Sequence, residues 1–191
     1  ERTGDKALIK FAQEYDHVSL NELTVTRAEI EAASQLVSKE LKEAIHTAQA
    51  NIEKFHAAQA KEELILEVMP GVTCRRKSVP IQRVGLYVPG GTAPLFSTVL
   101  MLGVPAKLAG CKEIVLCTPP NREGRIHPAI LYTADRIGIT KIVKVGGAQA
   151  VAALTFGTES VPKVDKIFGP GNQYVTAAKQ LATKYGVAID M

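Results

Sequence analysis

The chain has 191 residues, of which 46% are hydrophobic and 22% are charged, and its formal net charge is +4. These values are ordinary for a soluble globular protein, and the length allows one large domain or a domain with an arm. Basic residues are spread along the chain except for Arg75-Arg76-Lys77. We interpret that triplet as a solvated strand edge, because one short run is too small a footprint for nucleic acid. No apolar run reaches the roughly 18 residues that a membrane helix needs, so we expect neither a nucleic-acid partner nor a membrane.

The cysteine and histidine patterns argue against a disulfide scaffold and against a local metal site. The three cysteines, Cys74, Cys111 and Cys117, are odd in number and lack framework spacing, so we expect buried, reduced thiols in the cytoplasm. The four histidines form no metal-ligand motif. The sequence lacks a starting Met and closes on an apolar run, 187–191, so we interpret it as a piece cut at both ends.

Helical patterns dominate the chain up to about residue 62. Apolar residues at helical spacing predict a helix over 5–14, and Thr26-Arg-Ala-Glu29 is a capping box that begins another. An apolar stripe follows, with no Gly or Pro up to Gln59. Its members are Ile30, Ala33, Val37, Leu41, Ala44, Ala48, Ile52 and Phe55. This length is unusual for a globular helix, so we expect it either to bend or break, or to serve as an arm that packs on another domain or subunit.

A β-hairpin and then an alternating βα pattern are predicted for the rest of the chain. Two short runs of β character flank the turn signal Met69-Pro-Gly71, and a domain boundary is expected near residue 84. Short, continuous apolar runs predict strands at 81–88, 112–117, 141–145, 164–168 and 187–191. Helical segments lie between or after them at 97–109, 126–137, 148–156 and 173–185. Continuous rather than alternating apolar strands are typical of a parallel sheet buried on both faces, so we expect an α/β fold.

Three glycine-rich loops follow apolar strands and precede helices. They are Gly85-Leu-Tyr-Val-Pro-Gly-Gly-Thr92, Val145-Gly-Gly-Ala-Gln-Ala150 and Phe168-Gly-Pro-Gly-Asn172. Each strand–turn–helix unit brings backbone N–H groups and a positive helix end to one point. Open α/β sheets bind ligands at the carboxyl ends of their strands. The loops therefore predict a site for an anionic, nucleotide-like ligand, with glycines where the ligand approaches the backbone.

The standard dinucleotide fingerprint and the P-loop are both absent. Gly169 and Gly171 supply two of the three fingerprint glycines, but Tyr174 stands where the third belongs. The polar side chains at the loops are Tyr87, Thr92, Gln149 and Asn172. A phenol and two amides can pack on and hydrogen-bond a nicotinamide or an adenine. Each also has a structural interpretation: Tyr87 as a core ring, and Gln149 and Asn172 as helix caps.

The residues needed for bond-breaking chemistry are not recognisable in the sequence. The loops contain almost no His, Asp or Glu, and Asp190, at the end of the last predicted strand, has no evident partner. Taken by themselves, the residues indicate a ligand-binding α/β unit without its own acid–base pair, nucleophile or metal cluster.

The loops, taken in order, resemble the histidinol dehydrogenase family closely. The matching stretches are 85–101, 145–154, 156–172 and the closing Ala188-Ile-Asp-Met191. The resemblance covers nearly the whole chain and is weakest before residue 60. It implies a zinc-dependent, homodimeric oxidoreductase of histidine biosynthesis, which oxidises L-histidinol through an aldehyde to L-histidine and reduces two NAD⁺. The NAD-contacting Tyr, Gln and Asn of the family fall on Tyr87, Gln149 and Asn172.

The resemblance also implies which parts of such an enzyme this chain lacks. The family's zinc ligands, substrate-binding Ser and catalytic Glu–His pair all follow the Ile-Asp-Met segment, so we expect no catalytic and no metal-binding residue in this chain. Residues 86–191 resemble the family's incomplete Rossmann-like NAD-binding domain. Residues 1–85 resemble a helical arm, a short hairpin and the start of the other domain.

Two other functions stay open. The chain could belong to a paralogous zinc- and NAD-dependent dehydrogenase of another small amino or polyhydroxy alcohol. It could also be a non-catalytic nucleotide-binding or dimerisation module that is complete at this length.

Overall fold

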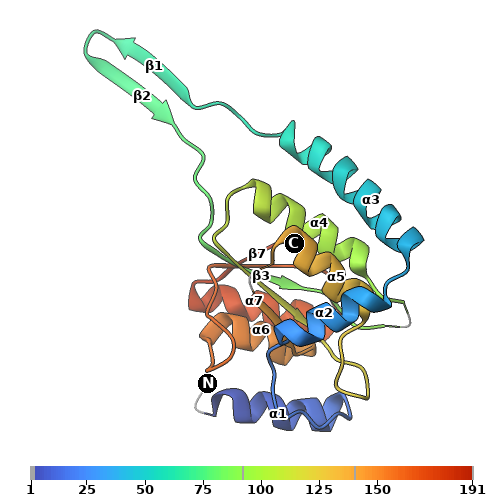
Figure 1. Ribbon diagram of the computed structural model, residues 1–191. Coiled ribbons are helices and arrows are strands. Elements are labelled where there is room, and N and C mark those ends of the chain that lie inside the picture. Colours follow the sequence, from blue (N-terminus) through green and yellow to red (C-terminus); the bar gives the residue numbers. More distant parts are fainter. Residues whose placement is uncertain (1–2, 92, 140, 191) are drawn as a thin grey trace.

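The computed structural model describes residues 3–91, 93–139 and 141–190, and it has the α/β architecture that the sequence predicts (Figure 1). The helices are α1 (Gly4–Tyr15), α2 (Arg27–Leu36), α3 (Lys39–Ala57), α4 (Phe96–Leu108), α5 (Pro128–Ile137), α6 (Gly147–Phe156), α7 (Gln173–Ala182) and the 3-10 turn η1 (Thr183–Tyr185). The strands are β1 (Leu64–Met69), β2 (Val72–Arg76), β3 (Arg83–Tyr87), β4 (Glu113–Thr118), β5 (Lys141–Lys144), β6 (Lys166–Phe168) and β7 (Ala188–Ile189). The predicted elements after residue 63 are confirmed to within a few residues at their ends.

The larger sheet is parallel and reverses its strand order at its centre. The described strands are arranged β5-β4-β3-β6-β7, and each neighbouring pair is parallel. The chain therefore runs outward from β3 through β4 to β5, and then returns to the other side of β3 to form β6 and β7. The adjacent strands β3 and β6 lie where the order reverses. Connections diverge from such a point and leave a crevice at the carboxyl ends of the strands.

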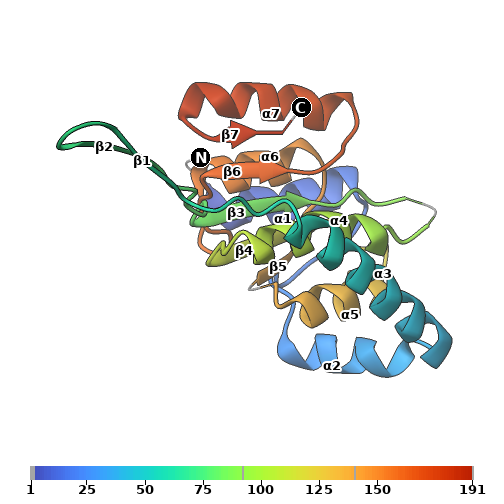
Figure 2. The ribbon, with the colours of Figure 1, turned by 90° about the horizontal axis from the view of Figure 1, so that it is seen from above.

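Each face of the sheet carries its own hydrophobic core, because successive strand residues point to opposite faces. On one face, Val84 and Leu86 of β3 pack with side chains of α2, α3, α4 and α5. On the other, Tyr87 and Cys117 pack with α1, α6 and α7. Figure 1 shows the sheet between these layers, with α3 and α4 above it and α1 and α6 below it, and Figure 2 looks down on the face of the sheet. A sheet covered on both faces explains why the strands read as continuous apolar runs.

The cysteines are free thiols, but they differ in burial. Cys117 lies in the core, where burial raises its thiol pKa to about 12. Cys111 is half-buried and Cys74 is exposed. The expectation of buried thiols is therefore wrong for Cys74, because the strand that carries it is covered on neither face.

The N-terminal helices pack on the helices that cover the two faces of the sheet. Leu8 and Ala12 of α1 join the core over α6, and Ser160 Oγ and backbone N–H both donate to the Asp5 carboxylate. The long predicted helix breaks, as one of the two alternatives anticipated. Val37 and Ser38 are extended, and Ser38 Oγ accepts the Leu41 N–H at 3.2 Å to begin α3. The break lets α2 lie over α5 while α3 lies over α4.

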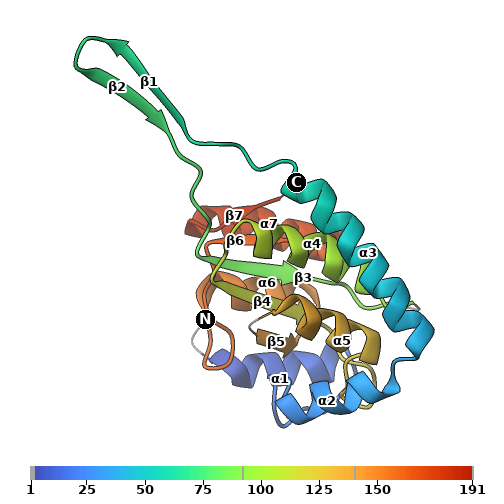
Figure 3. The ribbon, with the colours of Figure 1, turned by 45° about the horizontal axis from the view of Figure 1, so that its top comes forward.

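The predicted hairpin projects from the body of the molecule (Figures 1 and 3). All residues of β1 and β2 are exposed, and Gly71 takes a φ of +80° in the turn. The register places the apolar side chains largely on one face of the ribbon. That face carries Leu64, Leu66, Met69, Val72 and Cys74, and also Arg76, which lies opposite Leu64. The other face carries Ile65, Glu67, Thr73 and Arg75.

A half-buried ion pair ties α2 to the edge of the sheet. Glu29 completes the predicted capping box with Thr26, and its other oxygen contacts Lys144 Nζ of β5 at 2.5 Å. Burial alone would raise the pKa of Glu29, but the hydrogen bond from Lys144 and those at Thr26 outweigh it and lower that pKa. The segment before α2 also joins the edge strand, since Thr24 forms an antiparallel bridge with Val143.

The Gly169 peptide is held on three sides. Its φ is +130°, and a Cβ there would lie 2.0 Å from the Tyr87 carbonyl oxygen. Its N–H donates to Asp190 Oδ2 at 2.9 Å, and its carbonyl accepts from Lys179 Nζ at 2.9 Å. Lys179 also contacts Asp190 directly. Asp190 therefore has a partner that the sequence did not reveal, and the pair fixes the third glycine loop beside β3.

Replacing Lys179 with Met should destabilise the fold, because it leaves the Gly169 carbonyl and the Asp190 carboxylate without their buried cation. We expect a loss of about 2 kcal/mol in the free energy of unfolding, measured by urea denaturation. The matched change Lys184→Met, at an exposed site in η1, should stay within about 0.5 kcal/mol of the parent. Equal losses of unfolding free energy in the two variants would show that Lys179 does not stabilise the Gly169 loop through its buried contacts.

The Glu29–Lys144 pair should make stability depend on pH in the acid range. Because the pKa of folded Glu29 lies below its ordinary value of 4.5, its contribution is complete above about pH 4.5 and is lost as the pH falls through the folded pKa. Thermal unfolding of Glu29→Gln should therefore differ most from that of the parent near neutral pH, and the two curves should converge in acid. If the difference in melting temperature between Glu29→Gln and the parent grew as the pH fell, the stabilising role of the Glu29–Lys144 pair would be contradicted.

Candidate functional site

The three glycine loops meet at one groove at the carboxyl edge of the sheet. The groove encloses about 970 Å³, near the upper end of the range of about 300–1,000 Å³ for small-molecule sites. Its described lining comes from all three loops, the loop after β4 and the end of α1. These residues are Tyr15, Asp16, Tyr87, Pro89, Gly90, Pro119, Pro120, Asn121, Arg122, Gly147, Ala148, Gln149, Asn172 and Tyr174. The prediction that the loops converge is confirmed, and Tyr87, Gln149 and Asn172 share the groove wall. Thr92 lies outside the described residues.

Tyr87 lies in the groove wall and is also part of the core. Only 4% of it is exposed, and its hydroxyl accepts the Gly147 N–H at 3.0 Å. Burial is the main reason that the pKa of this phenol is raised, and the nearby Asp16 charge adds to the effect. The hydroxyl thus ties the end of β3 to the first turn of α6, and the ring is packed in the core instead of standing free in the groove.

Gln149 lies over the first turn of α6. Its side chain is half-buried, and a Cβ built on Gly147 would come within 2.7 Å of its Oε1 atom. Gly147 has a φ of +64°, and Gly146 precedes it in extended conformation without a side-chain cap. The positive end of α6 therefore faces the groove with backbone N–H groups and one amide side chain, a combination that suits an anionic or amide-bearing ligand.

Asn172 caps α7, as its structural interpretation requires. Its Oδ1 accepts the N–H groups of Tyr174 at 3.0 Å and Val175 at 3.1 Å. The residue is exposed at the groove, and the cap hydrogen bonds use only the oxygen of the amide. The capping geometry turns the Nδ2 group, a donor, away from the helix end. One residue can therefore serve both as a cap and as a hydrogen-bond donor to a ligand.

Most of the loop glycines pack on protein rather than opening the backbone to a ligand. Cβ atoms at Gly90 and Gly146 would lie 2.7 Å and 2.5 Å from the ring of Pro119, which is wedged between these two loops. Only Gly91, among the described loop glycines, has nothing within 4 Å of where a Cβ would stand. At Gly90 and Gly146 the space where a Cβ would stand is occupied by Pro119, so packing within the protein is sufficient to explain a glycine at both positions.

Several groove residues escaped the sequence reasoning. Tyr15 and Asp16 come from the end of α1, far from the glycine loops in sequence, and Asn121 and Arg122 come from a polar loop with no motif. Tyr15 is 61% exposed and Tyr174 67% exposed, so both present ring surface to solvent at the groove. The Tyr15 ring is stacked on Phe11 with centroids 5.8 Å apart. In the sequence, the only feature that could have pointed to these groove residues is an aromatic side chain on the polar face of a helix.

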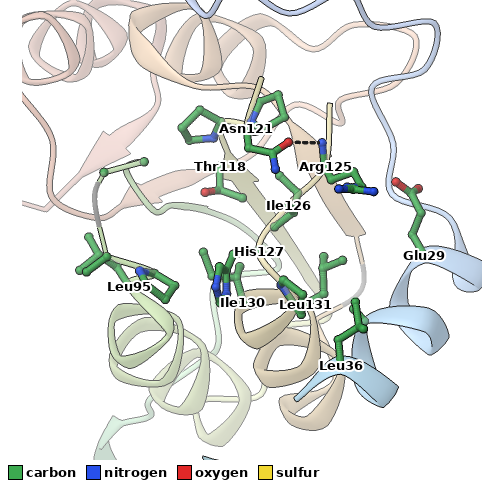
Figure 4. Close-up of a pocket in the computed structure, with 18 of the residues that line it drawn as sticks. Glu29, Leu36, Leu95, Thr118, Asn121, Arg125, Ile126, His127, Ile130 and Leu131 are labelled. Carbon is green, nitrogen blue, oxygen red and sulfur yellow. Dashed lines mark hydrogen bonds between the residues drawn. The ribbon is translucent and has the colours of Figure 1, made fainter. Parts of the chain in front are cut away.

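A second cavity of about 560 Å³ lies on the other side of the Pro119–Asn121 loop (Figure 4). Its wall is mainly apolar, with Leu36, Leu95, Ile126 and Leu131 among the residues that line it. Its polar groups are already engaged in local structure. Asn121 Oδ1 accepts the Arg125 N–H at 2.9 Å, and the ring of His127 caps α5 by accepting the Ala129 N–H at 3.2 Å. Glu29 also lines the cavity, and its carboxylate is paired with Lys144.

Within the described residues, no group of three or more His, Cys, Asp or Glu side chains is placed to hold a metal ion. Nor does any described helix have the length and apolar character needed to cross a membrane. What the groove assembles is a set of neutral hydrogen-bonding groups, ring surfaces and helix N-termini, together with one carboxylate, Asp16, and one guanidinium, Arg122. That set suits binding of a large polar ligand.

Comparisons with known proteins agree on one family. The sequence profile described as "Histidinol dehydrogenase" matches residues 1–191. The histidinol dehydrogenase of Bacteroides thetaiotaomicron is 62% identical over 188 residues, which are 98% of this chain and 44% of that protein. That of Pasteurella multocida is 56% identical over 188 residues, 98% of this chain and 43% of that protein. The crystal structure of histidinol dehydrogenase from Elizabethkingia anophelis is 60% identical with a TM-score of 0.96, covering 98% of this chain and 43% of that one.

The chain thus spans less than half the length of the relatives it matches, and the match includes the hairpin and the N-terminal helices as well as the sheet. The resemblance stated from the glycine loops is confirmed by a match that runs from end to end. This chain belongs to the histidinol dehydrogenase family.

Proposed function

We propose that the protein containing this chain oxidises L-histidinol to L-histidine through the aldehyde, as the last steps of histidine biosynthesis, with NAD⁺ as the oxidant. The observation that carries this proposal is the 62% identity over 98% of the chain to a histidinol dehydrogenase. We further propose that the protein is a cytoplasmic homodimer. Residues 86–191 form its NAD-binding part in this proposal, and residues 1–85 begin the other domain. The chain spans 44% of the length of that relative.

The groove fits a dinucleotide in size and in chemistry. It offers about 970 Å³, exposed rings at Tyr15 and Tyr174, and the N-termini of α6 and α7. Flat bases pack on rings, and a pyrophosphate is stabilised at helix N-termini. In the proposed assignment, Tyr87, Gln149 and Asn172 are the cofactor-binding residues. Tyr87 shapes the wall and holds the start of α6, whereas the amides of Gln149 and Asn172 donate to the ligand.

When bound, NAD⁺ supplies the hydride acceptor for both oxidation steps. The residues of this chain bind and orient it: the switch point between β3 and β6 fixes where the groove opens, and Pro119 sets the spacing of two loops. Zinc does not fit the described residues, since they hold no suitable ligand cluster. As the family resemblance implies, we place the zinc ligands and the acid–base residues of the whole protein after Met191, and we assign no catalytic step to this chain.

The paralogue and binding-module alternatives make different predictions from this proposal. A paralogue would reduce NAD⁺ with another amino or polyhydroxy alcohol but not with L-histidinol. A binding module would bind NAD⁺ without oxidising any alcohol. Family membership favours histidinol oxidation over both.

The full-length gene product should form two NADH for each L-histidinol consumed, and this activity should be lost on removal of zinc with a chelator. Residues 1–191 alone should bind NAD⁺ but form no NADH from histidinol, even with added zinc. NADH absorbance and product analysis measure both results. Turnover that co-purifies with residues 1–191 would show that the chemistry lies in this chain.

Asn172→Asp should separate the capping role of this residue from its proposed ligand role. The carboxylate keeps the cap and suits the positive helix end, so the free energy of unfolding should be unchanged or higher. It lacks the amide donor and repels a pyrophosphate, so NAD⁺ should bind about tenfold more weakly by calorimetry.

The companion variant Asn172→Ala should lose about 1 kcal/mol of stability because the cap is gone. If Asn172→Asp binds NAD⁺ as tightly as the parent, Asn172 acts only as a helix cap.

A further inference from the structure

Asp16 lies at the end of α1, in a backbone turn that is fixed and uncommon. Its N–H donates to the Ala12 carbonyl at 3.1 Å, which closes the helix. The next residue, His17, has a φ of +55° and is the only non-glycine residue with positive φ in the described part of the chain. Such conformations persist where the surroundings determine them, and they cluster at ligand sites. The turn places Asp16 on the groove wall beside Tyr15.

The Asp16 carboxylate lacks a partner for one of its oxygens. Its Oδ2 atom is buried and accepts no hydrogen bond from any residue that the structure describes. Burial raises the pKa of this carboxyl, and the nearby His17 only partly opposes that effect. Buried carboxylate oxygens in native proteins are nearly always hydrogen-bonded, so this orphan oxygen, on a residue that lines the groove, indicates a missing donor.

The chemistry of the groove restricts what that donor can be. The carboxylate repels an anionic group beside it, and the anionic part of a dinucleotide is better stabilised by Arg122 and by the N-termini of α6 and α7. The ring of the adjacent Tyr15 offers a surface for a flat base. A ribose lies between base and pyrophosphate, and its hydroxyls are neutral donors.

We propose that Asp16 accepts a hydrogen bond from a ribose hydroxyl of the bound dinucleotide and thereby selects NAD⁺ over NADP⁺. This inference rests on the proposed NAD⁺ binding. A carboxylate that binds the ribose diol cannot accommodate a 2′-phosphate, because the two negative charges would share one small volume. Selectivity in this protein thus comes from α1, outside the glycine loops.

The test compares Asp16→Asn with the parent in the full-length protein, with the binding of NAD⁺ and NADP⁺ measured by calorimetry. The parent should prefer NAD⁺. In Asp16→Asn, NAD⁺ should bind about tenfold more weakly, since a hydrogen bond to a charged acceptor is lost, and the preference over NADP⁺ should shrink. Glu22→Gln removes one charge at an exposed site in the same region and should leave both affinities unchanged.

The melting temperature distinguishes binding from a structural role. Asp16→Asn removes an uncompensated buried charge, so its melting temperature should be equal to or above that of the parent while its NAD⁺ affinity falls. Unchanged selectivity in Asp16→Asn, with the parent binding NAD⁺, would overturn the role of Asp16 alone. A parent protein that binds neither dinucleotide would overturn the proposed NAD⁺ binding as well.

A second ligand distinguishes the ribose from the base. Nicotinamide hypoxanthine dinucleotide, which lacks the adenine amine, should bind with the same affinity as NAD⁺ in both proteins. A loss of affinity confined to the parent would assign Asp16 to the base and overturn the ribose contact.

Discussion

The close approach of Gly169 to Tyr87 determines where this molecule can hold a ligand. β6 returns to pair beside β3, and at the end of that pairing the Gly169 backbone lies against the Tyr87 carbonyl with no room for a Cβ. From this point one connection leads to α4 on one face of the sheet and the other leads to α7 on the opposite face. The groove opens where they separate. Lys179 and Asp190, from α7 and the end of the last strand, hold the same peptide through its carbonyl and its N–H.

Sequence reasoning succeeded where the signal is local. Apolar runs such as 112–117 and the Met69-Pro-Gly71 turn require nothing beyond neighbouring residues, and the capping box at Thr26 formed as predicted. The break at Ser38 was harder to locate, because the stripe from Val37 to Leu41 continues in helical phase across it. Ser38 is compatible both with a helix interior and with a cap, and tertiary packing decides between them.

The part of the groove that the sequence did not predict depends on long-range contacts. Tyr15 and Asp16 reach it only because α1 packs over α6, and the partner of Asp190 depends on which strand lies beside which. The glycine loops do lie at the groove, but at Gly90 and Gly146 a side chain is excluded by the ring of Pro119. A glycine pattern indicates that the backbone is crowded. It does not indicate whether the neighbour is a ligand or the protein itself.

The hairpin has a consequence for how this chain behaves by itself. Its ribbon stands clear of the body, with apolar side chains on one face and unpaired edges along both sides. Two-stranded ribbons are marginally stable in isolation, and an exposed apolar edge recruits further strands. We therefore expect self-association of residues 1–191 to begin at this ribbon while the sheet and its helices remain folded.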